Sequence, residues 1–229
     1  MTGTELKSGR ERKGWGQELA ARRLGVSQPY LSLLERGERR VPERLARKAA
    51  GVYGLSAAVL PTEIARDGVQ PAGEDTLARD LAALGYPGFS YLKPGRKKNP
   101  AEIVLRALST PNLASRLTEA LPWVLLKFPD LDWGWLIAAA KLNDLQNRLG
   151  FVTGVARRLA ENLGEGEVAA LLARQESALE RSRLVREDTL CHESLTVAER
   201  RWLRENRPQE AKHWRLLTDL SPEHLGHAA

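Results

Sequence analysis

The sequence predicts an all-α protein with two domains, a small basic one followed by a larger neutral one. Apolar residues recur at spacings of three and four along most of the 229 residues, and β-branched runs are scarce, which favours helices over strands. Glycine and proline interrupt this pattern often enough to divide it into many helices. The chain is 42% apolar and 28% charged, which suffices for two modest globular domains.

The positive charge of the chain is concentrated at its N-terminal end. The formal net charge is +6, and residues 1–60 hold 12 Lys and Arg against 6 Asp and Glu, whereas residues 61–229 hold 23 of each. Such asymmetry is typical of a module that binds a polyanion joined to a neutral module. A solvated basic face is the alternative, and charge alone does not decide between the two.

Several short helices are expected in residues 1–60, which we interpret as the first domain. Glycine, the commonest helix-ending residue, stands after each of the first three, and Ser27 is a good N-cap for the third. Proline is tolerated in the first turn of the fourth. The expected elements are residues 4–13, 17–24, 28–36 and 42–53, with a final turn at 56–60.

Residues 61–75 are rich in proline, glycine and acid and are expected to be a linker. Pro122 predicts a break or kink in a helix over 112–126, and Thr196 with Glu199 matches a capping box. The tail from residue 221 is expected to fray. The second domain, residues 76–229, is therefore expected to be all-helical, with helices over 76–84, 101–108, 112–126, 131–163, 167–188, 196–206 and 208–217.

Residues 14–42, GWGQELAARRLGVSQPYLSLLERGERRVP, have the features of two short helices crossing around a tight turn. Gly25 tolerates the left-handed conformation that such a turn needs. A shared core is expected from Ala20, Ala21, Leu24, Val26, Leu31 and Leu34. The segment resembles the helix-turn-helix of the Cro/C1 repressor (XRE-type) family through Gln17, Ala21, Leu24-Gly25-Val26-Ser27, Tyr30-Leu31-Ser32 and Glu35-Arg36-Gly37.

The resemblance covers residues 4–60 and implies a five-helix, lambda-repressor-like DNA-binding domain. It places the second helix of the motif in the major groove, where Gln28 could make two hydrogen bonds to an adenine. Base-reading residues are then expected to be Gln28, Pro29, Ser32 and Leu33. Contacts to the DNA backbone are expected from Gln17, Ser27, Tyr30, Arg36, Arg39 and Arg40. The alternatives are a solvated Gln28, a Tyr30 that only packs in the core, and arginines that are simply solvated.

Residues 76–229 carry two further candidate surfaces. A basic cluster in a loop rich in Gly and Pro, Arg96, Lys97 and Lys98, could add a second nucleic-acid contact. An apolar seam along residues 131–163 includes Trp135, Leu142, Leu145 and Leu149. It predicts a dimer or partner surface, or burial inside its own domain. Asp144 and Arg148 are spaced for a surface ion pair, and the tryptophans are expected mostly in the core.

The sequence offers no motif for catalysis. The histidines form no HExxH or triad pattern, and there is neither a Walker A loop nor a GxGxxG turn. The single cysteine, Cys191, excludes an intramolecular disulfide. No signal peptide or membrane-spanning run is recognised. We therefore expect a cytoplasmic protein that is not an enzyme and needs neither a cofactor nor a metal.

Together these features predict a sequence-specific transcriptional regulator whose partner is double-stranded DNA. We expect a repressor acting as a homodimer on a near-palindromic operator, since two half-sites multiply specificity. The second domain would supply dimerisation, binding of a small-molecule effector, or binding of a protein partner. The alternative is an antitoxin that represses its own toxin–antitoxin or phage-defence operon and binds a toxin. An enzyme with a DNA-targeting domain is the third hypothesis.

Overall fold

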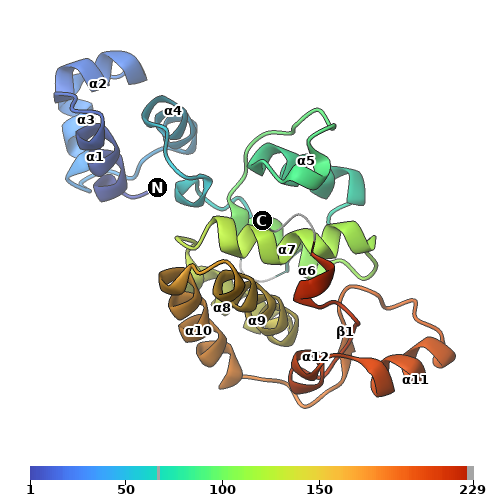
Figure 1. Cartoon of the computed structure of the whole chain (residues 1–229). Helices are drawn as coiled ribbons and strands as arrows, with labels where there is room; N and C mark the ends of the chain where they lie inside the picture. Colours follow the sequence, from blue (N-terminus) through green and yellow to red (C-terminus); the bar gives the residue numbers. More distant parts are fainter. Residues whose placement is uncertain (66–67, 226–229) are drawn as a thin grey trace. The chain divides into compact units, whose positions relative to one another are not determined.

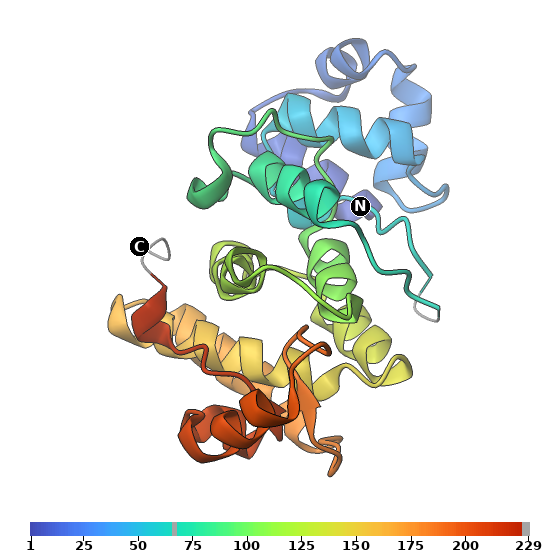
Figure 2. The same cartoon turned by 90° about the vertical axis from the view of Figure 1, so that its right-hand side faces the viewer.

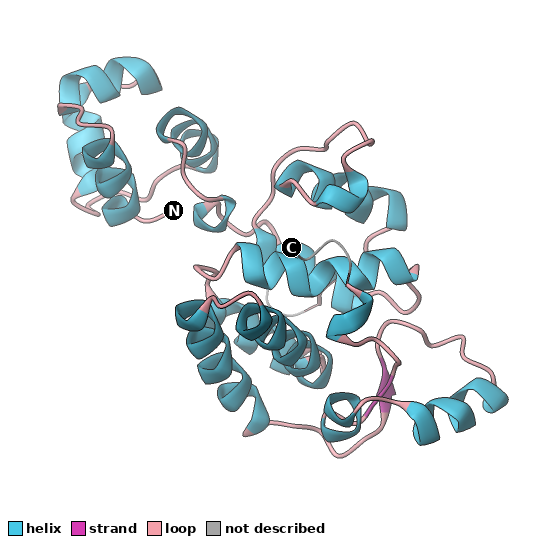
Figure 3. Ribbon diagram, viewed as in Figure 1, coloured by secondary structure: helices cyan, strands magenta, loops and turns pink. Residues whose placement is uncertain are grey.

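The structure is a computed structural model that describes residues 1–65 and 68–225. The chain divides into two compact units, Met1–Glu63 (unit 1) and Ile64–Ala229 (unit 2). The boundary between them falls inside the segment expected to be a linker. Most of the described residues are helical, as the cyan ribbons of Figure 3 show.

Unit 1 consists of short helices, and they follow the expected order. Its α1 begins with a capping box in which Thr2 accepts the Glu5 N–H and the Glu5 carboxylate accepts the Thr2 N–H. The fifth expected helix is a single 3₁₀ turn. The elements are α1 (Gly3–Arg12), α2 (Gln17–Leu24), α3 (Gln28–Glu35), α4 (Glu43–Tyr53) and η1 (Ala57–Val59).

Unit 2 is built from a longer series of helices with one small sheet (Figure 1). Its helices are α5 (Glu74–Leu84), α6 (Pro100–Ser109), α7 (Ser115–Lys127), α8 (Trp133–Leu142), α9 (Gln146–Asn162), α10 (Gly166–Glu180), α11 (Val197–Asn206) and α12 (Gln209–His213). Two 3₁₀ turns, η2 (Pro87–Phe89) and η3 (Pro222–His224), and two strands, β1 (Asp188–Thr189) and β2 (Leu216–Leu217), complete the described elements.

Helix α9 is the centre of unit 2. Every residue from Gln146 to Ala156 is buried, because α10 and α7 both pack against this helix, α7 crossing it (Figure 2). Trp214, only 1% exposed, lies against Gly150. A Cβ atom at residue 150 would be 2.4 Å from two ring atoms of this tryptophan. Glycine is therefore what allows the indole to lie directly on the backbone of α9.

The single long helix expected over residues 131–163 is wrong, because the structure has two helices, α8 and α9. Asp144 between them adopts a φ of 57°, which lies in the left-handed region and cannot continue an α-helix. The Asn143 side chain donates to the Ala139 carbonyl at 2.7 Å, and the Leu145 N–H donates to the Ala140 carbonyl at 2.8 Å. These two hydrogen bonds satisfy the carbonyls at the end of α8, so the chain can turn there.

Of the break or kink expected at Pro122, the break is wrong, since α7 runs continuously through this residue; a kink there stays a prediction. Proline removes one N–H donor from the helix, but the residues on both sides of it are deeply buried. Leu121 and Val124 are 0% exposed. Burial of this apolar face against the rest of unit 2 outweighs the lost hydrogen bond.

Two segments expected as helices end instead in the small parallel sheet. Residues 167–188 were expected to be one helix, but α10 ends at Glu180, and β1 begins at Asp188. Likewise 208–217 contains only α12 before β2. Asp188 pairs with Leu216 and Thr189 with Leu217. Strands of two residues have too few side chains to show a period of two, which is why the sequence pattern missed them.

Arg148 does not form the expected surface ion pair with Asp144. It is 5% exposed and donates to both carboxylate oxygens of Asp188, at 2.7 and 2.9 Å, and to the Leu108 carbonyl at 2.8 Å. Glu193 accepts a longer hydrogen bond from it at 3.4 Å. This one side chain therefore connects α9 to α6 and to the segment that contains β1.

The expected dimer or partner surface is mostly interior. Trp135, Leu145 and Leu149 are 8%, 7% and 0% exposed, whereas Leu142 is 63% exposed. The alternative, burial within its own domain, therefore holds for three of the four residues. Of the five tryptophans of unit 2, Trp202 alone is exposed, at 54%.

The C-terminal tail is only partly described. Pro222–His224 form a 3₁₀ turn rather than the frayed end that was expected, and residues 226–229 lie outside the described residues. The capping box at α11 is confirmed: Thr196 accepts the Glu199 N–H at 3.3 Å. Within the described part of the chain, no helix combines the length and the apolar character that crossing a membrane requires.

Candidate nucleic-acid interface

Helices α2 and α3 are joined by a tight turn whose geometry depends on two residues. Gly25 ends α2 with a φ of 73°, and its N–H donates to the carbonyls of Ala21 and Arg22. Left-handed backbone of this kind favours glycine. Ser27 then begins α3, since its hydroxyl accepts the Tyr30 N–H at 3.3 Å.

The two helices share an apolar core with α1 and α4. Leu31 and Leu34 of α3 are 0% exposed, and Ala20 of α2 is also 0% exposed. Val26, in the turn, packs against this cluster from its edge. The small side chains of α2 bring α3 close to it, and the opposite side of α3 is left free of core contacts. The core cluster contains Leu6, Ala20, Ala21, Leu24, Leu31, Leu34, Leu45, Ala49 and Tyr53.

A buried ion pair ties α1 to the end of α3. Arg10 donates to both carboxylate oxygens of Glu35, at 2.7 and 2.9 Å, and to the Trp15 carbonyl at 2.9 Å. The Arg10 and Glu35 side chains are 10% and 2% exposed. The two-point contact of a planar guanidinium with a carboxylate fixes the Glu35 side chain in one orientation.

The hydrogen bonds continue from Glu35 to the surface. Gln17, the first residue of α2, donates its side-chain amide to Glu35 at 2.9 Å. Gln28, the first residue of α3, donates to the Gln17 side-chain oxygen at 2.7 Å. Gln28 is exposed. A buried charge pair thus determines, through one intermediate amide, where an exposed amide lies at the start of α3.

Burial shapes the electrostatics around this pair. The hydrogen bonds from Arg10 to Glu35 raise the pKa of the arginine, and they outweigh the effect of its own burial, which lowers it. Nearby, burial and the negative charge of Glu35 raise the pKa of Tyr53 to about 12. Arg10 is therefore a permanent cation, and Tyr53 is a neutral phenol at any physiological pH.

The comparison with protein families agrees with this geometry. Residues 3–62 match the family model described as "Helix-turn-helix domain". These residues are a helix-turn-helix domain. The comparisons with curated proteins and with solved structures found no match to the chain. The family match does not extend beyond residue 62, so the role of unit 2 has to be inferred from its own structure.

The four predicted base-reading residues of the helix-turn-helix domain all lie on α3, but they differ in how far they are exposed to solvent. Gln28 and Pro29 are exposed in its first turn, and Ser32 and Leu33 are half-buried. An amide has two N–H donors and one oxygen acceptor. Since Gln28 uses one N–H on Gln17, it keeps the N–H and the oxygen that a two-point contact with adenine requires.

Some of the residues predicted to contact the DNA backbone have structural contacts within the helix-turn-helix domain, and others are exposed in the loop after α3. Ser27 serves as the cap of α3, and Tyr30 is half-buried at the edge of the core. Arg36 pairs with Glu38 at 2.5 Å and donates to the Ser32 hydroxyl at 2.9 Å. Arg39 and Arg40, in the loop after α3, are exposed. Exposed ion pairs such as that of Arg36 are weak, so a phosphate can compete with Glu38.

The members of the basic cluster outside the helix-turn-helix domain already interact with other groups of the protein. Lys98 pairs at 2.7 Å with Asp80, whose side chain is 5% exposed, so its charge is used within unit 2. Arg96 and Lys97 are exposed on the same loop. The loop is held to α5 by the Gly95 N–H, which donates to the Arg79 carbonyl at 3.0 Å. A nucleic-acid contact by this cluster stays a prediction for Arg96 and Lys97 and is disfavoured for Lys98.

Sequence reasoning did not assign a role to Arg10 or Glu35. Glu35 lies one helical turn after Leu31 and next to Leu34, on the side of α3 that faces the core. A carboxylate at such a position needs a buried cation. This need for a buried cation was the only sign in the sequence that Glu35 has a partner. The sequence does not say which of several N-terminal arginines is that partner.

Proposed function

We propose that this chain is a sequence-specific DNA-binding transcriptional regulator, and that it represses transcription as a homodimer on a near-palindromic operator. The observation that carries the proposal is the series of hydrogen bonds from Glu35 through Gln17 to Gln28. It holds an amide at the exposed N-terminal end of a capped helix in a helix-turn-helix domain. In this fold the second helix enters the major groove and reads base edges with its N-terminal residues.

The charge distribution supports the same proposal. All of the formal excess of positive charge lies in residues 1–60, and the loop that follows α3 exposes Arg39 and Arg40. Positive charge beside a reading helix gives affinity for any duplex through release of counterions. The amide of Gln28 then adds the preference for particular bases. We propose that the protein acts by binding in the cytoplasm rather than by catalysis.

The size of the reading helix supports the proposed homodimer. Helix α3 has 8 residues, and only its first turn and one face are free to contact bases. A single helix of this kind reads few base pairs, whereas two copies on adjacent half-sites multiply the discrimination. Unit 2 would supply the contact between the copies or the contact with a regulatory partner.

Selection from a pool of random duplexes, followed by footprinting upstream of the gene, tests the proposal. We expect enrichment of one short inverted repeat and protection of the same sequence near the promoter of the gene. Absence of any sequence-selective protection would reject the regulator. A second protein that co-purifies stoichiometrically and changes the footprint would favour the antitoxin hypothesis over a stand-alone repressor.

Substitution of Gln28 tests the reading role directly. Gln28→Ala should reduce discrimination between the selected site and a site changed at one base pair by about 1–3 kcal/mol. Affinity for unrelated DNA should change little, because that affinity comes from phosphate contacts. Gln209→Ala, an exposed glutamine of unit 2, is the matched control. Equal loss of affinity on all duplexes would show that Gln28 does not read bases.

The loop arginines should affect salt dependence instead of selectivity. Arg39→Ala and Arg40→Ala should each flatten the slope of log affinity against log salt concentration by about 0.9 for each phosphate that the arginine neutralises. Arg201→Ala, which removes an exposed arginine from unit 2, should leave the slope as it is. An unchanged slope in both loop variants would remove these arginines from the interface.

A further inference from the structure

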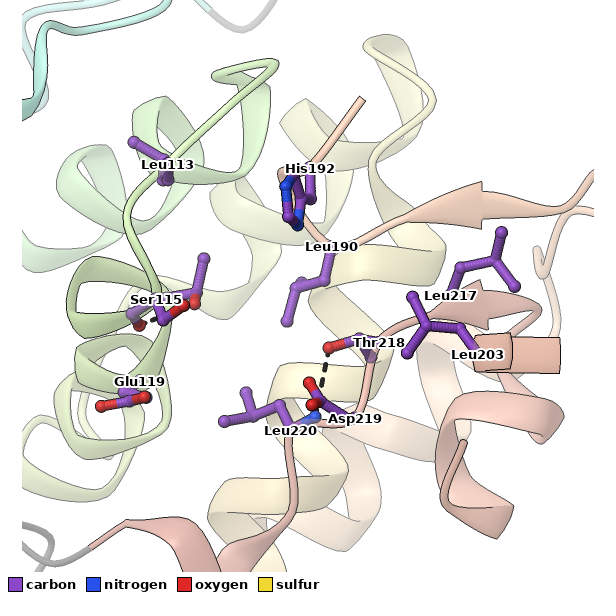
Figure 4. Close-up of a pocket in the computed structure, with 11 residues that line it drawn as sticks. Leu113, Ser115, Glu119, Leu190, His192, Leu203, Leu217, Thr218, Asp219 and Leu220 are labelled. Atoms are coloured by element: carbon purple, nitrogen blue, oxygen red, sulfur yellow. Dashed lines mark hydrogen bonds between the residues drawn. The ribbon is translucent and has the colours of Figure 1, made fainter. Parts of the chain in front are cut away.

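Unit 2 contains a pocket of about 220 Å³ that the proposed DNA contact does not use (Figure 4). It lies between the start of α7, the segment after β1, helix α11, and β2 with the chain that follows it. Its exposed lining is more polar than apolar, and the apolar part consists of leucines that are each at most 9% exposed. They are Leu113, Leu190, Leu203, Leu217 and Leu220.

The walls of the pocket are fixed by hydrogen bonds between segments far apart in sequence. The Leu113 N–H donates to the Cys191 carbonyl at 2.9 Å, and the Glu193 N–H donates to the Pro111 carbonyl at 3.0 Å. On the other side, pairing of β1 with β2 holds Leu217 beside Thr189. These backbone contacts hold the pocket open without a ligand. Binding therefore does not carry the entropy cost of ordering the pocket walls.

The polar rim of the pocket is negative. Two carboxylates line it, Glu119 of α7 and Asp219 after β2, and no lysine or arginine does. In the part of the chain that the structure describes, neither carboxylate takes part in an ion pair. Hydroxyl groups and one imidazole complete the rim, from Ser115, Thr118, Thr218 and His192. This composition contrasts with the positive net charge of the whole chain.

We propose that this pocket binds a small organic cation, a primary amine carried on an apolar body. The leucine wall would cover the body and remove it from water. The ammonium group would lie at the rim, where Glu119 and Asp219 attract it and the hydroxyl oxygens accept its remaining hydrogen bonds. An anionic ligand would face two carboxylates and no lysine or arginine.

The size of the pocket limits the ligand. Pockets for drug-sized molecules measure roughly 300–1,000 Å³, so a volume of about 220 Å³ suits a smaller molecule, such as an arylalkylamine with a single ring. Such a ligand would touch α7, the β1 segment and the β2 segment together. It would therefore stabilise the C-terminal part of unit 2 against local opening.

Titration of the full chain with three ligands of one shape tests the proposal. Phenethylamine, 2-phenylethanol and phenylacetate differ mainly in the charge of one group. Binding can be followed by calorimetry and by the methyl NMR signals of the pocket leucines. We expect saturable binding of the amine, with the alcohol at least about tenfold weaker, because a hydrogen bond to a charged group contributes more than a neutral one. Phenylacetate should bind most weakly.

Variants of the two carboxylates locate the amine. Glu119→Gln and Asp219→Asn should each reduce the affinity for phenethylamine and leave that for 2-phenylethanol nearly unchanged. Glu167→Gln, an exposed carboxylate of α10 outside the pocket, is the control. Equal affinity of the amine and the alcohol for the wild-type chain would overturn the proposal even if a variant failed to fold. So would absence of saturation, or wild-type affinity in the double variant.

Discussion

Two buried arginine–carboxylate pairs, one in each unit, have nearly identical geometry and different consequences. Arg10 contacts Glu35 at 2.7 and 2.9 Å, and Arg148 contacts Asp188 at the same two distances. Each arginine also donates to one backbone carbonyl, that of Trp15 or that of Leu108. The distances alone therefore do not distinguish the two pairs.

The difference lies in where the remaining hydrogen bonds lead. Glu35 accepts a further bond from Gln17, which leads to the exposed Gln28. Asp188 accepts a further bond from the Thr189 N–H within its own segment, at 2.7 Å. The first pair sets the position of a surface side chain, whereas the second joins three parts of unit 2. A buried ion pair thus acquires a role from its neighbours, and its own geometry does not reveal that role.

Removal of Arg148 should have the largest effect on stability. Arg148→Met leaves Asp188 partly buried without its cation, and a buried pair broken on one side costs about 3–5 kcal/mol. Urea unfolding of unit 2, followed by hydrogen exchange of α9, measures this loss. Arg174→Met, an exposed arginine of α10, is the control. Since unit 1 carries the proposed reading residues, the variant should keep its preference among DNA sequences. Loss of that preference would contradict the view that the Arg148 pair serves only the structure of unit 2.

Glu35→Gln should combine a smaller loss of stability with a loss of selectivity. The amide keeps one acceptor for Arg10 but removes the charge. We expect a cost of about 2–3 kcal/mol, below that of breaking a fully buried pair. The new N–H₂ group cannot accept from Gln17, so Gln28 should lose its fixed orientation. Discrimination among duplexes should fall, as measured by competition binding. A stable variant with full discrimination would show that the series of hydrogen bonds does not position Gln28.

The contribution of the Arg148–Asp188 pair to stability should depend on pH, because Asp188 can be protonated in acid. Burial tends to raise the pKa of Asp188, but the hydrogen bonds and the charge of Arg148 outweigh it, and the pKa lies below its ordinary value. A depressed folded-state pKa stabilises the fold at pH values above about 3.9, the unfolded value. That contribution is lost as the pH falls through the folded-state pKa. The gap in unfolding free energy between wild type and Asp188→Asn should therefore narrow below about pH 4.

The controls for this pH prediction lie in the same experiment. At neutral pH the gap should be constant, because Asp188 is fully ionised in both the folded and the unfolded chain. Unfolding free energies measured from pH 7 down to about pH 2.5 cover the window. A gap that stayed constant throughout that range would contradict the assignment of the depressed pKa to the contact with Arg148.

The fold of unit 1 was predictable because its signals are local. Gly25 ends one helix and Ser27 caps the next within three residues, and both adopt the expected conformations. The contact between Arg10 and Glu35 was not predictable in the same way. The two residues are 25 positions apart, and no periodic pattern indicates which arginine a buried glutamate will find.

Unit 2 was harder to predict because its decisive interactions join distant segments. The apolar spacing from Trp135 to Val152 continues across Asp144, although the backbone turns there. Nothing in the local sequence shows that Arg148 is needed 40 residues away at Asp188. The pocket has the same origin, since its walls come from α7, the β1 segment, α11 and the β2 segment. Helical periodicity reports which face is apolar and does not report what covers it.

The contact between Gly150 and Trp214 has a consequence for how related sequences can vary. A side chain at position 150 would overlap the indole, since a Cβ there lies 2.4 Å from the ring. A related chain that replaces Gly150 should therefore carry a smaller residue at position 214, and one that keeps the tryptophan should keep the glycine. The two positions, 64 residues apart, should be inherited as a pair, and such covariation would mark the chains that share this packing of α9.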